Sequence, residues 1–223
     1  MSLCHVVGVL KKHNTSYSTF VCNFTGAENS TSFVDLTGKP ITAHGNVHIG
    51  TGGQHGYFDG SGDYLTVPDS DDWTTSGLFT HEIFLAFETK TDSQAIMGQW
   101  NDPNAWYLWI VSGQLSIRMN SGAFTDLSFT WTPVLGQKYH IAVSRDVSNV
   151  LRLYIDGAMV ASMTYAAVMA ESDEPLVIGA IGVNNAFSGF DFNGKIYGAR
   201  LTKGQALYAT DTSFTVPTLP FTL

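Results

Sequence analysis

Short runs of alternating apolar and polar residues, separated by turn-forming residues about every ten positions, dominate this sequence. The clearest example joins residues 150–155 and 159–165 across the dipeptide Asp156-Gly157. Asp-Gly favours the positive φ angles that both central positions of a tight hairpin turn require. The rhythm is typical of an antiparallel sandwich, so we predict an all-β fold with two packed sheets.

The same pattern predicts strands along most of the chain. Helical periodicity is absent, and residues 203–208 form at most one helical turn. Residues 25–46 should be mostly loop with one or two brief strands, and the proline-punctuated segment 214–221 should lie extended along the domain. We expect strands at residues 4–10, 20–24, 57–59, 63–67, 79–87, 95–100, 106–111, 114–119, 124–129, 138–145, 150–155, 159–165, 175–179 and 192–201.

Two of these segments carry apolar residues on both faces. In residues 79–87 the core set begins at Phe79, but Phe84 and Ala86 lie in the other set. Residues 106–111 are apolar at every position. Because successive strand side chains point to opposite faces, the second face of residues 79–87 is not simply exposed to water. Residues 106–111 are typical either of a central strand of two packed sheets or of a strand whose outer face holds a ligand.

The stretch from Tyr57 to Trp73 combines several strong local signals. Residues 57–59 and 63–67 flank Gly-Ser-Gly, a connector of the length and glycine content that closes a β-hairpin. Pro68 then ends the second strand, because proline has no N–H for a ladder. We therefore predict a hairpin, followed by a loop rich in carboxylates.

Length and charge limit the possible functions. With 223 residues the chain suits one large domain, 1–223, in which residues 1–19 form an N-terminal extension or an edge strand. A formal charge of -8 opposes attraction to a phosphate backbone, so nucleic acid is not an expected partner. No apolar run has the length of a membrane span. No signal peptide is recognisable, because the short apolar run 6–10 precedes Lys11 and Lys12.

The two cysteines are Cys4 and Cys22. They could pair if residues 4–10 run antiparallel to residues 18–24, but two buried free thiols are the favoured interpretation. Without a third cysteine or a CxxC pair there is no metal or redox signature.

Six segments, in order and spacing, resemble a known family: FDGSGDYLTVPDSDDW, FTHEIFLAFET, KYHIAVSRD, LRLYIDGAMVAS, PLVIGA and FNGKIYGARLTKGQALY. They resemble the concanavalin A-like, laminin G-like jelly-roll domains, and most nearly the single-domain versions in phage tail and virion proteins. The resemblance covers roughly residues 20–221. It implies the lectin/glucanase fold, a two-sheet antiparallel jelly-roll sandwich with recognition on the concave face or on rim loops. Calcium and sugars are common ligands in this family.

The resemblance also raises the question of catalysis, since the same jelly roll occurs in retaining glucanases. Those enzymes carry Glu, Asp and Glu at alternating positions of one strand, so that two carboxylates lie about 5 Å apart. None of the five glutamates here forms that array, and Glu82 and Glu88, on one strand face, are about 20 Å apart. We therefore expect no enzyme activity, with glycoside hydrolase as a remote alternative.

Calcium is the metal that the sequence favours. Calcium prefers six to eight oxygen ligands, and the loop after Pro68 supplies Asp69, Asp71 and Asp72. Asp63 stands where related calcium-dependent jelly rolls place a ligand. The alternative is a solvated acidic turn in which these aspartates bond to the backbone.

Sugar recognition needs an aromatic platform with amides and carboxylates beside it. Residues 99–109 contain Trp100, Asn101, Asp102 and Trp109 in this role, while Trp106 is expected in the core. Asn184, Asn185 and Asp191 could line the same rim.

The resulting hypothesis is a non-enzymatic recognition module that binds cell-surface carbohydrate and is located on a phage virion or tail, or is otherwise extracellular. The alternative is a purely structural virion protein, a capsid decoration or fibre subunit, that associates with itself or with other virion proteins through its sheet faces.

Overall fold

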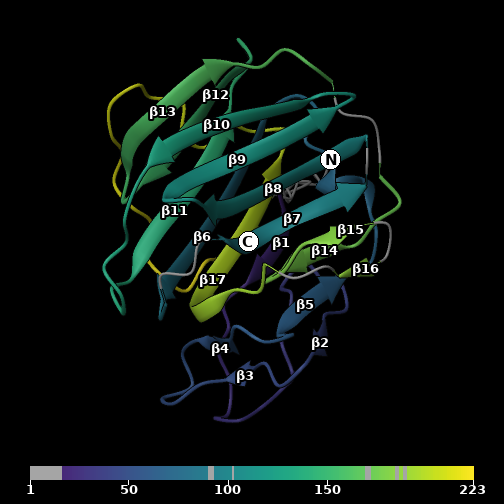
Figure 1. Cartoon of the computed structure of the whole chain (residues 1–223), viewed down its shortest axis with the longest axis vertical. Helices are drawn as coiled ribbons and strands as arrows, with labels where there is room; N and C mark the ends of the chain where they lie inside the picture. Colours follow the sequence, from purple (N-terminus) through teal and green to yellow (C-terminus); the bar gives the residue numbers. More distant parts are fainter. Residues whose placement is uncertain (1–16, 90–92, 102, 169–171, 184–185, 188–189) are drawn as a thin grey trace, which may run out of the picture.

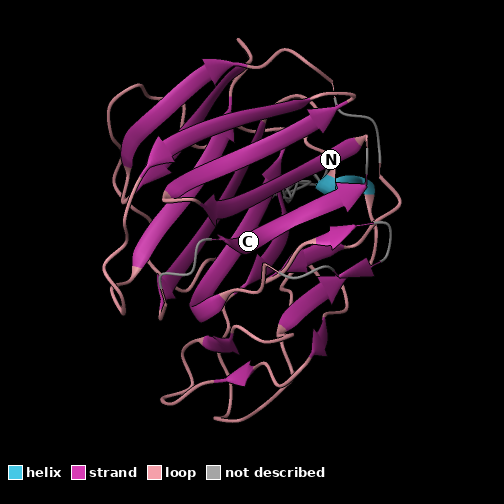
Figure 2. Cartoon of the chain, in the orientation of Figure 1, coloured by secondary structure: helices cyan, strands magenta, loops and turns pink. Residues whose placement is uncertain are grey.

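The computed structural model describes residues 17–89, 93–101, 103–168, 172–183, 186–187 and 190–223. Two antiparallel sheets pack face to face, with β7 to β10 in front of β6, β11 and β17 (Figure 1). Within the described residues the only helix is a 3₁₀ turn, η1 (Asp71–Trp73), and residues 203–208 contain none (Figure 2). The predicted all-β sandwich is confirmed.

The larger sheet contains eight strands among the described residues. Its order is β13 (Ala158–Thr164), β12 (Val150–Ile155), β11 (Tyr139–Arg145), β6 (Phe79–Phe87), β17 (Asn193–Lys203), β4 (Gly56–Asp59) and β3 (His48–Ile49), and β1 (Ser18–Cys22) also pairs with β17. The β12–β13 hairpin turns at Asp156 and Gly157, with φ of 47° and 79°, as the sequence predicts.

In the part of the chain that the structure describes, the second sheet contains seven strands. Its order is β10 (Phe124–Thr130), β9 (Gln114–Ser121), β8 (Asn104–Val111), β7 (Ser93–Asn101), β14 (Leu176–Ile178), β5 (Tyr64–Val67) and β2 (Thr42–His44). The strands β15 (Gly182–Val183) and β16 (Ala186–Phe187) pair with each other and form a separate two-stranded sheet.

The hydrophobic core fills the space between the sheets. Phe79, Ile83 and Leu85 of β6 face Trp106 and Leu108 of β8, and all five belong to one buried cluster. Trp106 also donates its indole N–H to the carbonyl of Trp73 at 2.8 Å, which satisfies its polar atom. Its predicted place in the core is confirmed.

The C-terminal segment covers the outer face of the larger sheet. Phe84 contacts Phe221 with ring centroids 5.7 Å apart, and His140 contacts Phe214 at 5.9 Å. This cover explains why Phe84, on the outer side of β6, is almost fully buried. As predicted, residues 214–221 lie along the domain, and they contain neither helix nor strand.

A buried polar network lies under the same cover. Both carboxylate oxygens of Glu82 are used: one pairs with Arg200 at 2.6 Å, and the other accepts from His140 at 2.9 Å and from Tyr208 at 2.8 Å. Burial acts to raise the pKa of Glu82, but the hydrogen bond from His140 and the charge of Arg200 outweigh it and lower that pKa. Glu82 is therefore an ionised structural group in the sheet.

The predicted hairpin between residues 57–59 and 63–67 is wrong. β4 pairs with β3 and β17 in one sheet, whereas β5 pairs with β2 and β14 in the other. The Gly-Ser-Gly connector therefore carries the chain across the sandwich, with φ of 82° at Gly60 and 75° at Gly62. A sheet-crossing arch and a hairpin use the same short glycine connector, and only the distant partner strands distinguish them.

Asp63 holds this arch in place. Its side chain is fully buried, and its carboxylate accepts the backbone N–H of Asn46 at 2.7 Å and of Asp59 at 3.0 Å. One carboxylate thus joins the end of β4, the start of β5 and the loop before β3.

The described residues include only part of the N-terminal segment for which predictions were made. The expected strand at 4–10 and Cys4 lie outside the described residues. Cys22 is a buried free thiol in β1, and burial raises its pKa to about 12. In the described part of the chain, no helix is long and apolar enough to span a membrane.

Replacing Asp63 with alanine should lower the free energy of unfolding by about 2–4 kcal/mol, because two buried N–H groups lose a charged acceptor. Chemical denaturation measures the difference. Asp59→Ala is the matched control, since among the described residues the Asp59 carboxylate accepts a hydrogen bond only from Ser61, in an exposed turn. Equal losses in the two variants would contradict the role given to Asp63.

His81 is buried between the rings of Phe79 and Trp106. Burial lowers the pKa of its imidazole to about 3, so unfolding takes up a proton when the pH is below the ordinary value of 6.5. Stability should therefore fall as the pH drops from 6.5 towards 3, by about 1.4 kcal/mol per pH unit for this one proton. Urea denaturation measures the free energy of unfolding across this pH range. Its dependence on pH should be weaker in His81→Leu by the equivalent of one proton. Parallel curves for the two proteins would refute this assignment.

Candidate functional site

The outer face of the seven-stranded sheet carries a group of aromatic side chains around one arginine. We define the aromatic face as Trp100 of β7, Tyr107 and Trp109 of β8, Arg118 of β9 and Phe124 of β10. In β8 these residues alternate with Trp106, Leu108 and Ile110, which point into the core. The apolar character of both faces of residues 106–111 therefore has two separate causes, a core on one side and this cluster on the other.

A close approach of β7 and β8 supports the cluster. Gly98 is paired with Tyr107, next to an irregular register between Ala95 and Met97. A Cβ atom at Gly98 would lie 2.4 Å from the Cβ of Tyr107 and 2.5 Å from the carbonyl oxygen of Trp106. Only glycine fits there, and the space it leaves is filled by the Tyr107 side chain.

Arg118 is the electrostatic centre of the aromatic face. Its guanidinium makes a two-point ion pair with Asp126, with both N–O distances 2.6 Å, and donates to the Tyr107 hydroxyl at 3.2 Å. It also lies 5.0 Å from the ring centroids of both Trp109 and Phe124. The hydrogen bonds to Asp126 raise the pKa of Arg118 above its ordinary value, and burial raises the pKa of Tyr107. The arginine is thus permanently charged but locally neutralised.

The aromatic rings differ strongly in exposure. Tyr107 and Trp109 are buried, with 4% and 7% of their surface exposed, whereas Phe124 is 54% exposed. Trp100 is half-buried and stacks against Phe124, with centroids 5.6 Å apart and planes 11° apart. Phe190, 42% exposed, meets the edge of Trp109. The accessible platform is therefore Phe124 with Trp100 behind it.

Two indole N–H groups in this cluster have no acceptor among the described residues. The Nε1 atoms of Trp100 and Trp109 are buried and make no hydrogen bond to any described residue. A buried N–H that lacks a partner costs free energy, and such groups are few in native proteins. The aromatic face therefore holds unused polar capacity beside its apolar surface.

The residues predicted for sugar recognition are partly brought together. Trp100 and Trp109 lie on one face, and Asn101 ends β7 opposite Asn104. The Asp191 carboxylate instead accepts a hydrogen bond from the backbone N–H of Gly62 at 3.1 Å. Asp102, Asn184 and Asn185 lie outside the described residues.

The aspartates predicted to bind calcium mostly bond to protein groups. Both oxygens of Asp63 bond to the arch, Asp69 accepts from Gln99 at 3.1 Å, and Asp72 pairs with Lys39 at 2.8 Å. Burial, with the charges of Asp173 and Asp71, raises the pKa of Asp69. In the described ranges no three His, Cys, Asp or Glu side chains are arranged to hold a metal ion. These four residues do not fit one calcium site, and calcium binding stays a prediction.

Sequence reasoning missed Arg118, Asp126 and Phe124. The predicted strands 114–119 and 124–129 flank a short turn, and counting outward from that turn places Arg118 opposite Thr125. The structure instead pairs Arg118 with Asp126, a register shifted by one residue. The hairpin could therefore be predicted from the sequence, but the register that brings this ion pair together could not.

Two antiparallel sheets packed face to face, one with an open aromatic outer face, define a jelly-roll sandwich of the lectin-like class. The family model described as "Concanavalin A-like lectin/glucanases superfamily", a laminin G-type model, matches residues 59–210. The chain belongs to this superfamily. A search of curated proteins finds no match.

Solved structures with the same fold include binding domains of botulinum neurotoxins. One is the serotype D ligand binding domain in complex with N-acetylneuraminic acid (TM-score 0.68, 13% identity, 86% of this chain and 48% of that chain). Another is the binding domain of neurotoxin DC in complex with SialylT (TM-score 0.64, 11% identity, 83% of this chain and 47% of that chain). At these identities the likeness shows the fold alone, and this chain spans about half the length of those chains.

Replacing Gly98 with alanine should displace Tyr107 and cost about 1–3 kcal/mol of stability through overpacking. The tryptophan emission should change as well, because Tyr107 contacts both Trp100 and Trp109 at its edges. Denaturation followed by fluorescence measures both effects. Unchanged stability and spectrum would show that the two strands separate there without cost.

Proposed function

We propose that this protein is a non-enzymatic carbohydrate-binding module whose aromatic face contacts the sugar. The observation that carries the proposal is the exposed ring of Phe124, supported from behind by Trp100 and flanked by the Arg118–Asp126 ion pair. A pyranose has an apolar face of C–H groups, which packs on an aromatic ring, and a rim of hydroxyls, which need fixed donors and acceptors. The aromatic face offers both kinds of contact side by side.

The ion pair suits neutral hydroxyls better than it suits a charged ligand. Arg118 is already matched by Asp126, so a charged ligand group would have to compete with a two-point salt bridge. Sugar hydroxyls instead accept from the guanidinium edge and donate to the carboxylate without breaking the pair. The orphan indole N–H groups of Trp100 and Trp109 are further donors if the surrounding side chains shift on binding.

The comparisons support the general class. The superfamily includes lectins, and the similar structures are binding domains, two of which were solved with N-acetylneuraminic acid or SialylT. Because this chain spans about half of those chains, their ligands indicate the kind of ligand to test here and do not identify the ligand of this protein.

The glutamates support a binding role over a catalytic one. Glu82 is fully buried in its network with Arg200 and His140, and Glu88 pairs with Lys195 at 2.8 Å. Neither of the two glutamates on one strand face is available as a paired acid and nucleophile.

The setting that we propose is a phage virion or tail, where the module meets cell-surface glycans outside the cell. In the competing proposal, a structural virion subunit, the same exposed Phe124 and Phe190 pack against another copy or a neighbouring protein. Mass measurement in solution separates the two, since a monomer with exposed aromatics favours the glycan role. A thermal melt with calcium and with chelator tests whether a calcium ion assists it.

Phe124→Ala should weaken glycan binding by about tenfold or more, if the ring contributes as much to a sugar as it does to a stacked nucleobase, roughly 1–3 kcal/mol. A glycan array identifies the ligand, and calorimetry then compares the variants. Tyr17→Ala is the matched control, since Tyr17 is 48% exposed and its carbonyl accepts from Lys203 at the end of β17, in the other sheet. The proposal fails if no glycan binds, or if both variants bind as the wild type does.

A further inference from the structure

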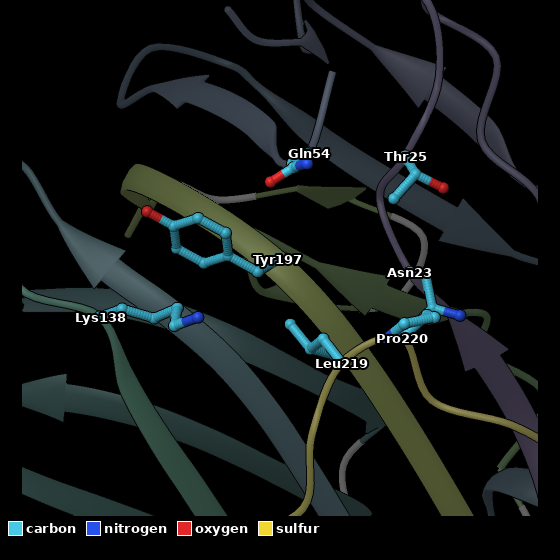
Figure 3. Close-up of a pocket in the computed structure, with 7 residues that line it drawn as sticks. All are labelled: Asn23, Thr25, Gln54, Lys138, Tyr197, Leu219 and Pro220. Carbon is cyan, nitrogen blue, oxygen red and sulfur yellow. The ribbon is translucent and has the colours of Figure 1, made fainter. Parts of the chain in front are cut away.

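A second concave surface lies on the outer face of the larger sheet, away from the aromatic face. We define the Lys138 pocket as the depression lined by Asn23, Thr25, Gln54, Lys138, Tyr197, Leu219 and Pro220, with a volume of about 390 Å³ (Figure 3). Lys138 and Tyr197 lie on one side, and Asn23, Thr25 and Pro220 on the other. This volume lies within the range of small-ligand sites, roughly 300–1,000 Å³.

Lys138 differs from every other described cation. The other described lysines and arginines each make an ion pair or donate a hydrogen bond to a protein oxygen. The Lys138 ammonium makes neither with any described residue, and instead lies 5.8 Å from the ring of Phe84 and 5.4 Å from the ring of Tyr197. Cation–π contacts position a charge without neutralising it, so all three N–H donors stay available.

The Lys138 pocket differs in charge from the protein as a whole. The chain carries a formal charge of -8, so its overall field repels anions, yet none of the residues that line the Lys138 pocket is acidic. A lone ammonium held over two rings in a pocket without carboxylates is a local site for a negative group.

The remaining walls indicate what carries that negative group. Tyr197 and Leu219 provide apolar surface, while Gln54 and Thr25 provide an amide and a hydroxyl at exposed positions. Asn23 is already committed, because its amide binds both the N–H and the carbonyl of Phe221. The pocket therefore combines one cation, one aromatic wall and a few neutral polar groups, which matches a small polyhydroxylated ring that bears a carboxylate.

A neighbouring depression gives the ligand room to continue. His48, Thr51, His55, Tyr57 and Lys195 line a second hollow of about 410 Å³. The His55 ring, which lines this hollow, lies 5.6 Å from the ring of Tyr197, which lines the Lys138 pocket. The two hollows are thus neighbours across the contact between these two rings.

We propose that the Lys138 pocket is a binding site for a carboxylate-bearing sugar unit, in which the ammonium of Lys138 pairs with the carboxylate and Tyr197 packs on the ring. This site is separate from the aromatic face and does not depend on the function proposed for it.

D-Glucuronate and D-glucose form the matched pair of probes, because they differ only in the carboxylate. Calorimetry should show glucuronate binding that weakens as salt is added, and glucose binding weaker by about tenfold or more. In an ¹⁵N-resolved NMR titration, the side-chain amide of Gln54 should shift with glucuronate. Absence of glucuronate binding, or equal affinity for both sugars, would overturn the proposal.

Two substitutions at one position isolate the charge. Lys138→Met keeps an unbranched stem over the rings and should weaken glucuronate binding by about tenfold, whereas Lys138→Arg keeps the charge and should retain most of the affinity. Both melting temperatures should stay near that of the wild type, because Lys138 is exposed. Retained affinity in Lys138→Met would overturn the proposal.

Phe124→Ala makes the two sites distinguishable. It should leave glucuronate binding unchanged, whatever it does to glycans on the aromatic face. Loss of glucuronate binding in Phe124→Ala, but not in Lys138→Met, would place the acid on the aromatic face and overturn the assignment made here.

Discussion

The covering of the larger sheet by the C-terminal segment is the constraint on which the arrangement of surfaces depends. Asn23 fixes the end of that segment, since its side chain accepts from the N–H of Phe221 at 2.7 Å and donates to the carbonyl of Phe221 at 2.9 Å. With Phe221 in place, Phe84 and the charged network of Glu82 are shielded from water. A buried carboxylate needs its partners within reach and water kept away, so the clamp and the network stabilise each other. The uncovered outer face is then that of the other sheet.

The two outer faces consequently offer different chemistry. On the open sheet, Arg118 is paired with Asp126 and sits among aromatic rings, so the surface is apolar with its charges matched. On the covered sheet, the tail leaves a hollow beside Leu219 in which Lys138 is unmatched. The tail therefore does two things: it completes a buried layer, and it forms one wall of the more cationic of the two surfaces.

The strand positions could be predicted from the sequence because alternation is a local property. Gly60-Ser61-Gly62 shows the limit of that approach. A hairpin and an arch across the sandwich share the same glycine connector and flanking pattern, and the choice depends on β17 and β14, far away in the chain. The site shows the same division. Trp100 and Trp109 could be found from composition, but Phe124 and Arg118 required the cross-strand register, and Lys138 required the course of the C-terminal segment.

The separation of the two surfaces has an energetic consequence. They lie on opposite outer sides of a sandwich whose sheets alone are about 10 Å apart, so no side chain is shared between them. Sites without shared partners behave additively, which means that changes at Phe124 and at Lys138 should combine without coupling. One short glycan cannot reach both faces of the same molecule. A longer or branched glycan, or two neighbouring ones, can engage both, and the second contact then occurs at the high effective concentration set by the first. Under the two-site proposal, weak binding on each face would suffice for firm attachment to a dense carbohydrate surface.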